Sequence, residues 1–277
     1  MNLIVQGPGL IREQAQELAG LLRIKSIEVI SARAFRFKNP PLEKQVVETW
    51  AAERQVDHAW VPEGRRFADL RLLAMDMDST LITIECIDEL GDMAGKKAEI
   101  AGITAQAMAG EIDYPESLRR RVALLAGLKE SALERVYQER LHLTPGAEAL
   151  VFACKRSGVK LLLVSGGFTF FTERLKARLD LDYTVSNTLE VEHGRITGKV
   201  LGNIIGAEAK AAKFVSILKS LRTTKEHSVA IGDGANDLKM MAEAGLSIAF
   251  HAKPVVRAQA SCAINWSGLD AVVNLFE

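Results

Sequence analysis

The stretch Leu72-Leu73-Ala74-Met75-Asp76-Met77-Asp78-Ser79-Thr80 joins a short apolar run to two carboxylates. The run predicts a buried strand, and Asp76 and Asp78 emerge where that strand ends. A second apolar run, Val229-Ala230-Ile231, leads in the same way into Gly232-Asp233-Gly234-Ala235-Asn236-Asp237. In an open α/β sheet the chemistry lies at the carboxyl ends of the strands. The sequence therefore predicts an α/β fold with a parallel sheet and one acidic pocket at its edge.

Acidic groups held in one pocket repel each other. Two carboxylates about 4 Å apart, at an effective dielectric constant near 20, repel by roughly 4 kcal/mol, or about three pKa units. A divalent cation offsets this repulsion most simply, and a shared proton is the alternative. Oxygen ligands with no His or Cys nearby in the sequence favour Mg²⁺ over zinc.

The composition is that of an ordinary globular protein with no net charge. The 277 residues include 35 Lys plus Arg and 35 Asp plus Glu, so no overall field favours nucleic acid or an anionic membrane as a partner. Cys86, Cys154 and Cys262 are too few and too widely spaced for a disulfide framework or a zinc site. The opening residues lack a signal-peptide pattern, and no apolar stretch of about 18 residues follows. We therefore expect a soluble, cytoplasmic protein.

Residues 1–70 are predicted to form a small α+β N-terminal domain. Short apolar runs predict strands, and apolar residues at helical spacing predict helices. Turn residues such as Gly7-Pro8-Gly9 and Asn39-Pro40-Pro41 separate these elements. The predicted strands are 2–6, 27–30 and 58–61, and the predicted helices are 10–22 and 42–53.

Residues 71–277 are predicted to form the main α/β domain, with a helical insertion at about 85–140. The insertion is rich in helix-forming residues, and its glycines at 95, 102, 110 and 127 are the expected breaks. Strands are expected at 160–164 and 246–250. One helix is expected to follow Ser165-Gly166-Gly167 and to end at about residue 179, and another is expected over 210–221. Residues 182–201 read as a hairpin that turns at His193-Gly194 and lies outside the main sheet.

Several motifs follow one another in a fixed order along the chain. Asp76 to Thr80 is followed by Ser165-Gly166-Gly167 after a strand, then by Lys210, and then by Gly232 to Asp237. Each motif alone has a structural explanation, such as a turn or a helix cap. Together they resemble the haloacid dehalogenase superfamily, and more closely its phosphoserine phosphatase family, over about residues 71–277. The resemblance implies a Rossmann-like core with an inserted helical cap.

The resemblance also implies a mechanism of phosphoryl transfer. Asp76 would attack phosphorus and carry an aspartyl-phosphate, while Asp78 would act first as general acid and then as general base. Mg²⁺ would be bound by Asp76, the backbone carbonyl of Asp78 and Asp233, and Asp237 would support these ligands from nearby. A loose transition state makes positioning and charge neutralisation the main tasks of such a site.

Phosphate binding falls to a second group of residues in the same resemblance. Ser165 and Gly166 match the motif whose hydroxyl and backbone N–H donate to phosphate oxygens. Lys210 matches the phosphate-binding lysine, and Lys213 is the alternative register. Asn236 is assigned to substrate binding.

The helical cap carries the residues that would recognise the rest of the substrate. Glu85 would bind an amino group and Arg121 a carboxylate, which together suit the zwitterion O-phospho-L-serine. The alternative for Arg121 is a solvated charge within the run Arg119-Arg120-Arg121. Met108 and Tyr114 would shield the substrate, although the family more commonly has Phe in place of Tyr114. A buried hydroxyl there needs a hydrogen-bond partner.

Two other functions and three roles for the N-terminal domain remain alternatives. The protein could hydrolyse or transfer phosphate from another small phosphomonoester, or it could be a non-catalytic regulator that binds an amino acid. The N-terminal domain resembles a short ACT-like appendage, with Gly7-Pro8-Gly9-Leu10 at the turn from strand to helix. It would bind an amino acid, form a homodimer or have a purely structural role.

Overall fold

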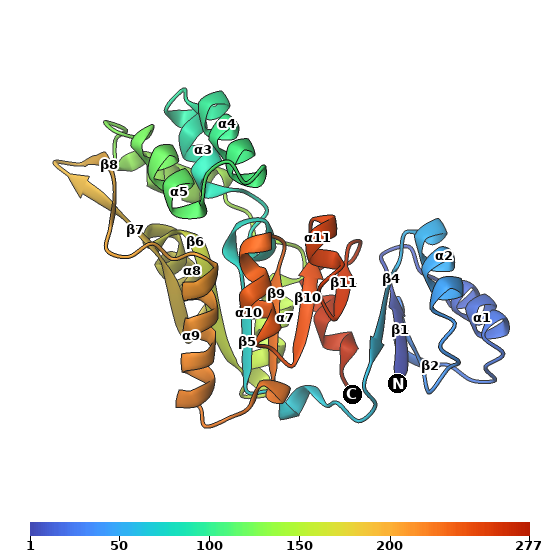
Figure 1. Ribbon diagram of the computed structural model, residues 1–277. Coiled ribbons are helices and arrows are strands. Elements are labelled where there is room, and N and C mark those ends of the chain that lie inside the picture. Colours follow the sequence, from blue (N-terminus) through green and yellow to red (C-terminus); the bar gives the residue numbers. More distant parts are fainter.

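A four-stranded antiparallel sheet forms the first part of the chain in the computed structural model, which describes residues 1–277 (Figure 1). Helices α1 (Arg12–Leu21) and α2 (Lys44–Arg54) cover one face of this sheet. The strands, in the spatial order β2-β3-β1-β4, are β1 (Asn2–Gln6), β2 (Glu28–Ser31), β3 (Ala34–Phe37) and β4 (Asp57–Val61).

Strand β3 is the element of this part that the sequence did not predict. All four of its residues are buried, so it shows no alternation of polar and apolar side chains. Arg36 is buried because its guanidinium donates to the backbone carbonyls of Asn274 and Phe276, near the end of the chain. A strand covered on both faces is recognised in a sequence by a continuous apolar run, and Arg36 interrupts that run.

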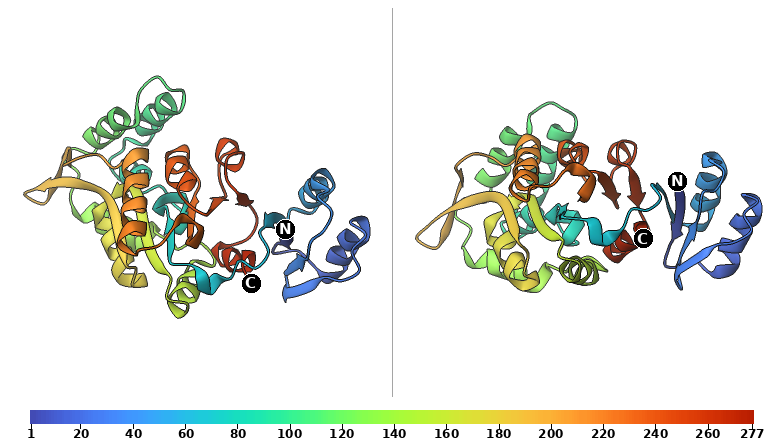
Figure 2. Two further views of the ribbon diagram at one scale, coloured as in Figure 1. Left: turned by 60° about the horizontal axis from the view of Figure 1, so that its bottom comes forward. Right: turned by 90° about the horizontal axis from the view of Figure 1, so that it is seen from below.

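The N-terminal sheet also packs against the rest of the protein. Leu3 and Val5 face α1 and α2, whereas Ile4, Ala59 and Val61 belong to the large core of the main body. The buried carboxylate of Asp57 accepts hydrogen bonds from the backbone N–H groups of residues 265–267, at 2.6–3.3 Å. Figure 2 shows this sheet beside the C-terminal segment from two further sides.

A seven-stranded sheet forms the main body. Its strands run parallel, except that β8 is antiparallel to β7. Their spatial order is β11-β10-β9-β5-β6-β7-β8. The strands are β5 (Leu72–Met75), β6 (Lys160–Phe168), β7 (Tyr183–Glu192), β8 (Arg195–Leu201), β9 (Ser228–Gly232), β10 (Leu246–Phe250) and β11 (Cys262–Ile264).

The hairpin β7–β8 corrects one prediction. Its turn lies at His193-Gly194 as predicted, but the prediction that it lies outside the main sheet is wrong. Leu162 to Val164 of β6 pair in parallel with Tyr183 to Val185 of β7, and β8 then forms the edge of the sheet. The start of β7 therefore belongs to the sheet, and its far end projects from it (Figure 1).

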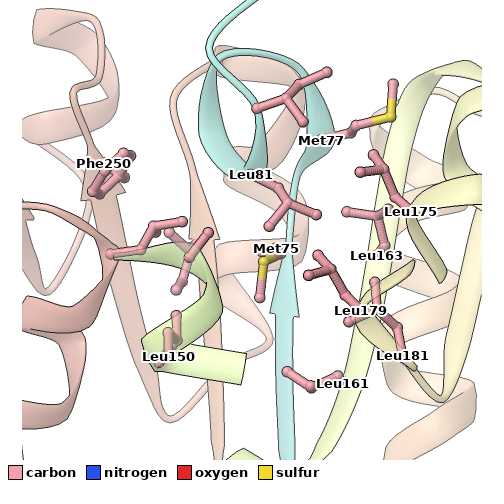
Figure 3. Close-up of a cluster of buried hydrophobic side chains, with 14 of the residues drawn as sticks. Met75, Met77, Leu81, Leu150, Leu161, Leu163, Leu175, Leu179, Leu181 and Phe250 are labelled. Carbon is pink, nitrogen blue, oxygen red and sulfur yellow. The ribbon is translucent and has the colours of Figure 1, made fainter. Parts of the chain in front are cut away.

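Helices cover both faces of the main sheet, because alternate strand residues point to opposite sides. Leu72 and Ala74 of β5 face a core with α9 (Ala207–Ser220), α10 (Leu238–Ala242) and α11 (Pro254–Arg257). Leu73 and Met75 face the opposite core with α7 (Ala147–Arg156), α8 (Thr169–Leu179) and the 3₁₀-helix Leu269–Leu275. Figure 3 shows this second core, where Met75, Met77 and Leu81 pack beside the end of β5.

The predicted helical insertion stands above the carboxyl ends of the central strands (Figure 1). It contains α3 (Cys86–Met93), α4 (Lys97–Met108), α5 (Tyr114–Ala123) and α6 (Ser131–Arg135). Helices end near residues 95, 110 and 127, but the predicted break at Gly102 is wrong, since Gly102 lies inside α4 with a helical backbone. None of the helices combines the length and apolar character that crossing a membrane requires.

Candidate active site

Three neighbouring parallel strands bring the acidic and polar motifs to one edge of the main sheet. Met75 of β5 pairs with Leu163 of β6 and with Ile231 of β9. Asp76 and Asp233 each lie just beyond one of these strands, and Ser165 lies two residues beyond Leu163. The motifs are therefore brought together at the carboxyl edge of the sheet, where we expected them.

The turn after β5 is held by contacts at both of its ends. The carboxylate of Asp76 accepts a hydrogen bond from the backbone N–H of Met77 at 2.7 Å. Ser79 adopts a left-handed backbone, with φ of 54°, so the chain turns sharply toward the cap. Met77 and Leu81 are fully buried and anchor the turn in the core (Figure 3).

A buried lysine lies among three carboxylates. Oxygen atoms of Asp76, Asp233 and Asp237 lie within 4.8 Å of one another. Lys210 from α9 has no exposed surface, and its Nζ donates to Asp76 Oδ2 at 2.7 Å and to Asp237 Oδ1 at 2.8 Å. The second oxygen of Asp237 accepts from the backbone of Gly234 at 3.2 Å. Both oxygens of Asp237 are thus engaged, whereas the carboxylate of Asp233 accepts only a long 3.4 Å bond from Thr80.

The electrostatics of this group favour a further cation. Burial and then the charge of Asp76 raise the pKa of Asp233 to about 6. The same two causes raise the pKa of Asp237 to about 8. Burial opposes the charge of Lys210, but the carboxylates of Asp237 and Asp76 raise its pKa above the usual value. One lysine does not neutralise three carboxylates, so the oxygen cluster suits a hard divalent ion.

Asp78 lies between the cap and the strand that carries Ser165. One of its oxygens accepts from the backbone N–H of Cys86, at the start of α3, at 2.9 Å. The other accepts from the Ser165 hydroxyl at 3.4 Å. Burial raises the pKa of Asp78 to about 6, and the charge of Asp76 acts in the same direction. A carboxyl group with this pKa can both hold and release a proton near neutral pH.

The segment Ser165-Gly166-Gly167, near the end of β6, is fixed by side chains from two other elements. The carbonyl of Gly166 accepts from the Tyr114 hydroxyl at 3.0 Å and from Asn187 Nδ2 at 2.8 Å. A Cβ at residue 166 would lie 2.2 Å from the Tyr114 oxygen, so only glycine allows this approach. The side-chain oxygen of Asn187 accepts from the backbone N–H of Ile205 at 2.8 Å.

Asn187 is a site residue that the sequence reasoning missed. Its side chain is buried and joins Gly166 of β6 to the segment that leads into α9. Its bonding partners lie 21 and 18 residues away along the chain. A polar residue within a predicted strand gives no local signal of such contacts.

The cap contributes Glu85, Tyr114 and Arg121 to the arrangement. Glu85 Oε1 accepts from the Ser79 hydroxyl at 2.7 Å. Burial and then the charge of Asp78 raise the pKa of Glu85 to about 8. Arg121 lies two helical turns after Tyr114 on α5, and its side chain bonds only the Ser117 carbonyl of its own helix, at 3.4 Å. Burial raises the pKa of Tyr114 to about 12.

Two further predicted site residues lie in different settings. Asn236 Nδ2 approaches Asp76 Oδ2 at 3.5 Å, so it belongs to the acidic cluster. Met108 lies at the end of α4 with its side chain 66% exposed, and the structure does not bring it to the other residues. Between the two lysine registers, Lys210 and not Lys213 makes ion pairs with the acidic residues.

Comparison with known proteins agrees with this geometry. The family model of haloacid dehalogenase-like hydrolases matches residues 73–242. A phosphoserine phosphatase of Polaromonas sp. is 54% identical over 215 residues, which span 76% of this chain and 91% of that protein. This chain belongs to the phosphoserine phosphatase family of haloacid dehalogenase-like hydrolases. The resemblance drawn from the sequence motifs is thereby confirmed.

Solved structures of related proteins are similar to this phosphoserine phosphatase family member over nearly its whole chain. The unliganded structure of a probable phosphoserine phosphatase from Vibrio cholerae has a TM-score of 0.86 at 37% identity. The superposition covers 99% of this chain and 85% of the Vibrio cholerae chain, so the N-terminal sheet is included. A haloacid dehalogenase family hydrolase from Salmonella enterica serovar Typhi has a TM-score of 0.90 at 31% identity, covering 100% of this chain and 99% of its own.

Proposed function

We propose that this protein hydrolyses O-phospho-L-serine to L-serine and phosphate, the last step of L-serine biosynthesis. The observation that carries the proposal is the combined site, in which the acidic cluster around Lys210 lies beneath a cap that carries Glu85 and Arg121. The first group suits a phosphoryl group with a cation, and the second suits a zwitterion. Membership of the phosphoserine phosphatase family gives independent support.

In the first half of the reaction, Asp76 acts as the nucleophile. A carboxylate oxygen of Asp76 forms a bond to phosphorus while the bond from phosphorus to the serine oxygen breaks. Asp78 donates its proton to the departing serine oxygen. A pKa of Asp78 raised to about 6 supports this role, because a proton is more readily retained for donation.

In the second half, Asp78 takes the proton back. The Asp78 carboxylate accepts a proton from water while the water oxygen attacks the phosphorus of the aspartyl-phosphate. The bond between phosphorus and Asp76 breaks, so phosphate is released and the Asp76 carboxylate is restored. Lys210, Ser165 and the backbone at Gly166 would hold the phosphoryl oxygens in line for both steps.

Mg²⁺ is the cofactor that we propose for this site. Asp76, the backbone carbonyl of Asp78 and Asp233 would bind it, and Asp237, which is bonded to Lys210 and Gly234, would support these ligands from nearby. When bound, Mg²⁺ would neutralise negative charge on the phosphoryl oxygens. All-oxygen ligands support Mg²⁺ over a softer metal.

Substrate recognition is assigned to the cap. Glu85 carries a raised pKa, so the ammonium group of serine would favour its ionised form. The terminal nitrogens of Arg121 make no hydrogen bond within the protein and can donate to the serine carboxylate. The hydroxyl of Tyr114, which the family more commonly lacks, bonds the Gly166 carbonyl and so ties the cap to the end of β6. Asn236 would contribute near Asp76, and Met108 would reach the substrate only if the cap moves.

We also infer that residues 1–70 form a separate domain, that 71–277 form the phosphatase domain and that 85–140 form its cap. A separate 13-residue core beneath α1 and α2 supports the first division. The opposite face of the N-terminal sheet is packed on the main body, which favours a structural role over amino-acid sensing or homodimer formation. Three free, buried cysteines suit a cytoplasmic location.

The proposed function is tested with a panel of small phosphomonoesters. Phosphate release is measured from O-phospho-L-serine, phosphoethanolamine, glycerol phosphate and p-nitrophenyl phosphate, each with Mg²⁺ and with chelator. We expect the highest kcat/KM for O-phospho-L-serine, and loss of turnover in chelator. A higher kcat/KM for an ester without amino and carboxylate groups would refute the assignment of Glu85 and Arg121. Failure of the folded protein to hydrolyse any ester would favour a non-catalytic regulator.

A further inference from the structure

The edge strand β8 supports the cap helix α5 through the segment that follows the helix. The backbone N–H of Gly127 donates to the carbonyl of Ile196 at 2.8 Å, and the N–H of Ile196 donates to the carbonyl of Leu128 at 2.9 Å. The guanidinium of Arg195 donates to the carbonyl of Gly127 at 2.6 Å. The main sheet therefore continues by backbone hydrogen bonds into the cap, beside the C-terminal end of α5 (Figure 1).

A side chain added to β8 at Gly198 would meet the end of α5. A Cβ on residue 198 would lie 3.0 Å from Ala126 Cβ and 3.3 Å from both the Cα and the carbonyl oxygen of Ala123. Two of these three atoms are backbone atoms, so they cannot move without moving the end of the helix. Gly198 also has a backbone φ of 89°, which residues other than glycine rarely adopt. Glycine at this position sets how closely α5 rests on the sheet.

The same helix carries two residues of the proposed site. Arg121 lies two residues before Ala123, close to the contact with Gly198. Tyr114 lies at the other end of α5 and bonds the Gly166 carbonyl. A helix held at both ends moves as a unit, so a displacement at Ala123 would move the Arg121 guanidinium relative to Ser165 and Gly166.

The chain before and after β8 also reaches Gly166 or its partner Tyr114. Asn187 on β7 donates to the Gly166 carbonyl. After β8, the chain reaches Gly206, where an added Cβ would lie 3.3 Å from the Tyr114 ring. The hairpin β7–β8 thus contacts the site through Asn187 and supports the C-terminal end of α5 through Gly198.

We propose that Gly198 is a positioning residue for the substrate carboxylate, acting through α5 and Arg121. The proposal rests on the proposed function for the identity of the substrate. Gly198 touches neither the reacting phosphoryl group nor Asp76, so its replacement should alter substrate affinity while leaving the chemical step largely intact. The predicted signature is a rise in KM that depends on the carboxylate group of the substrate.

The test compares Gly198→Ala with a matched control, Gly202→Ala. Gly202 has a similar φ of 72° but nothing within 4 Å of an added Cβ, so its substitution strains the backbone without pushing on α5. We expect Gly198→Ala to raise KM for O-phospho-L-serine about tenfold, since displacements of a fraction of an ångström have large effects on bound geometry. KM for p-nitrophenyl phosphate, which lacks both recognised groups, should stay unchanged, and Gly202→Ala should change neither value.

Two further measurements keep the test decisive. Arg195→Ala removes an exposed side chain that bonds Gly127, so it should fold normally and raise the same KM by a smaller factor. Hydrogen exchange of the α5 amides should be faster in Gly198→Ala than in the wild type and in Gly202→Ala. Equal exchange, or an equal loss on both substrates, would overturn the role of Gly198. Wild-type activity on O-phospho-L-serine tests the proposed function separately from these ratios.

Discussion

Replacing Lys210 with Met should destabilise the metal-free protein strongly. The side chain has no exposed surface and donates to Asp76 at 2.7 Å and to Asp237 at 2.8 Å. Met has a similar length but no charge, so Lys210→Met removes the only cation that is bonded to this group of carboxylates while keeping most of the packing. The remaining acidic groups must then either repel each other or bind protons.

The size of the effect follows from the spacing of the acidic groups. Carboxylate oxygens within 4.8 Å of one another repel by about 3 kcal/mol per ionised pair at an effective dielectric constant near 20. Protonation limits this repulsion but has its own cost. Removing one partner from a buried ion pair typically costs about 3–5 kcal/mol. We expect the free energy of unfolding of Lys210→Met to fall by this amount in chelator.

Urea unfolding in chelator at neutral pH measures this loss. The double variant Lys210→Met/Asp237→Asn should recover much of it, since the second substitution removes the charge left without a partner. Lys239→Met is the control, because Lys239 pairs with Glu208 at the surface and should matter little. A loss in Lys210→Met no larger than in Lys239→Met would refute the electrostatic account of this centre.

Three further predictions concern the domain interface, pH dependence and substrate affinity. Asp57→Ala would leave the backbone N–H groups of residues 265–267 without their acceptor, so urea unfolding should show a loss of about 3 kcal/mol or more; a loss below about 1 kcal/mol would contradict this. Burial lowers the pKa of His58 below its usual 6.5, so the unfolded chain binds more protons below that pH and stability should fall as pH falls through 6.5. His58→Gln should flatten this decline, and an unchanged slope would exclude His58 as its cause. Arg121→Ala should chiefly raise KM for O-phospho-L-serine in steady-state assays. A fall in kcat with no change in KM would argue against carboxylate binding by Arg121.

The acidic centre could be predicted because its signals are local. Asp76 and Asp233 each follow a short apolar strand, and parallel strands with helical connections place such residues at one edge. Burial is the first cause of the raised pKa of about 6 for Asp233, and the charge of Asp76, the repulsion that we expected from clustered carboxylates, is the second. Lys210 required the family resemblance, because a lysine on a helix is ordinarily solvated.

Long-range contacts account for what the sequence did not reveal. Strand β3 contains the buried Arg36, whose partners lie near the end of the chain. The place of β7 in the main sheet depends on pairing with β6, and the hairpin signal at His193-Gly194 says nothing about that pairing. Asn187 and Gly198 likewise owe their roles to neighbours outside their own strands. Each of these features depends on which segments meet, which local patterns do not encode.

The central claim is that Asp76 takes the phosphoryl group from O-phospho-L-serine. It is tested by mixing the enzyme with O-phospho-L-serine and Mg²⁺, quenching in acid during turnover, and mapping the phosphorylated peptide by mass spectrometry. We expect a phosphoryl group on Asp76 in the wild type, and neither phosphoenzyme nor phosphate release in folded Asp76→Asn. Normal phosphate release by folded Asp76→Asn, or a phosphoryl group on another residue, would contradict the account.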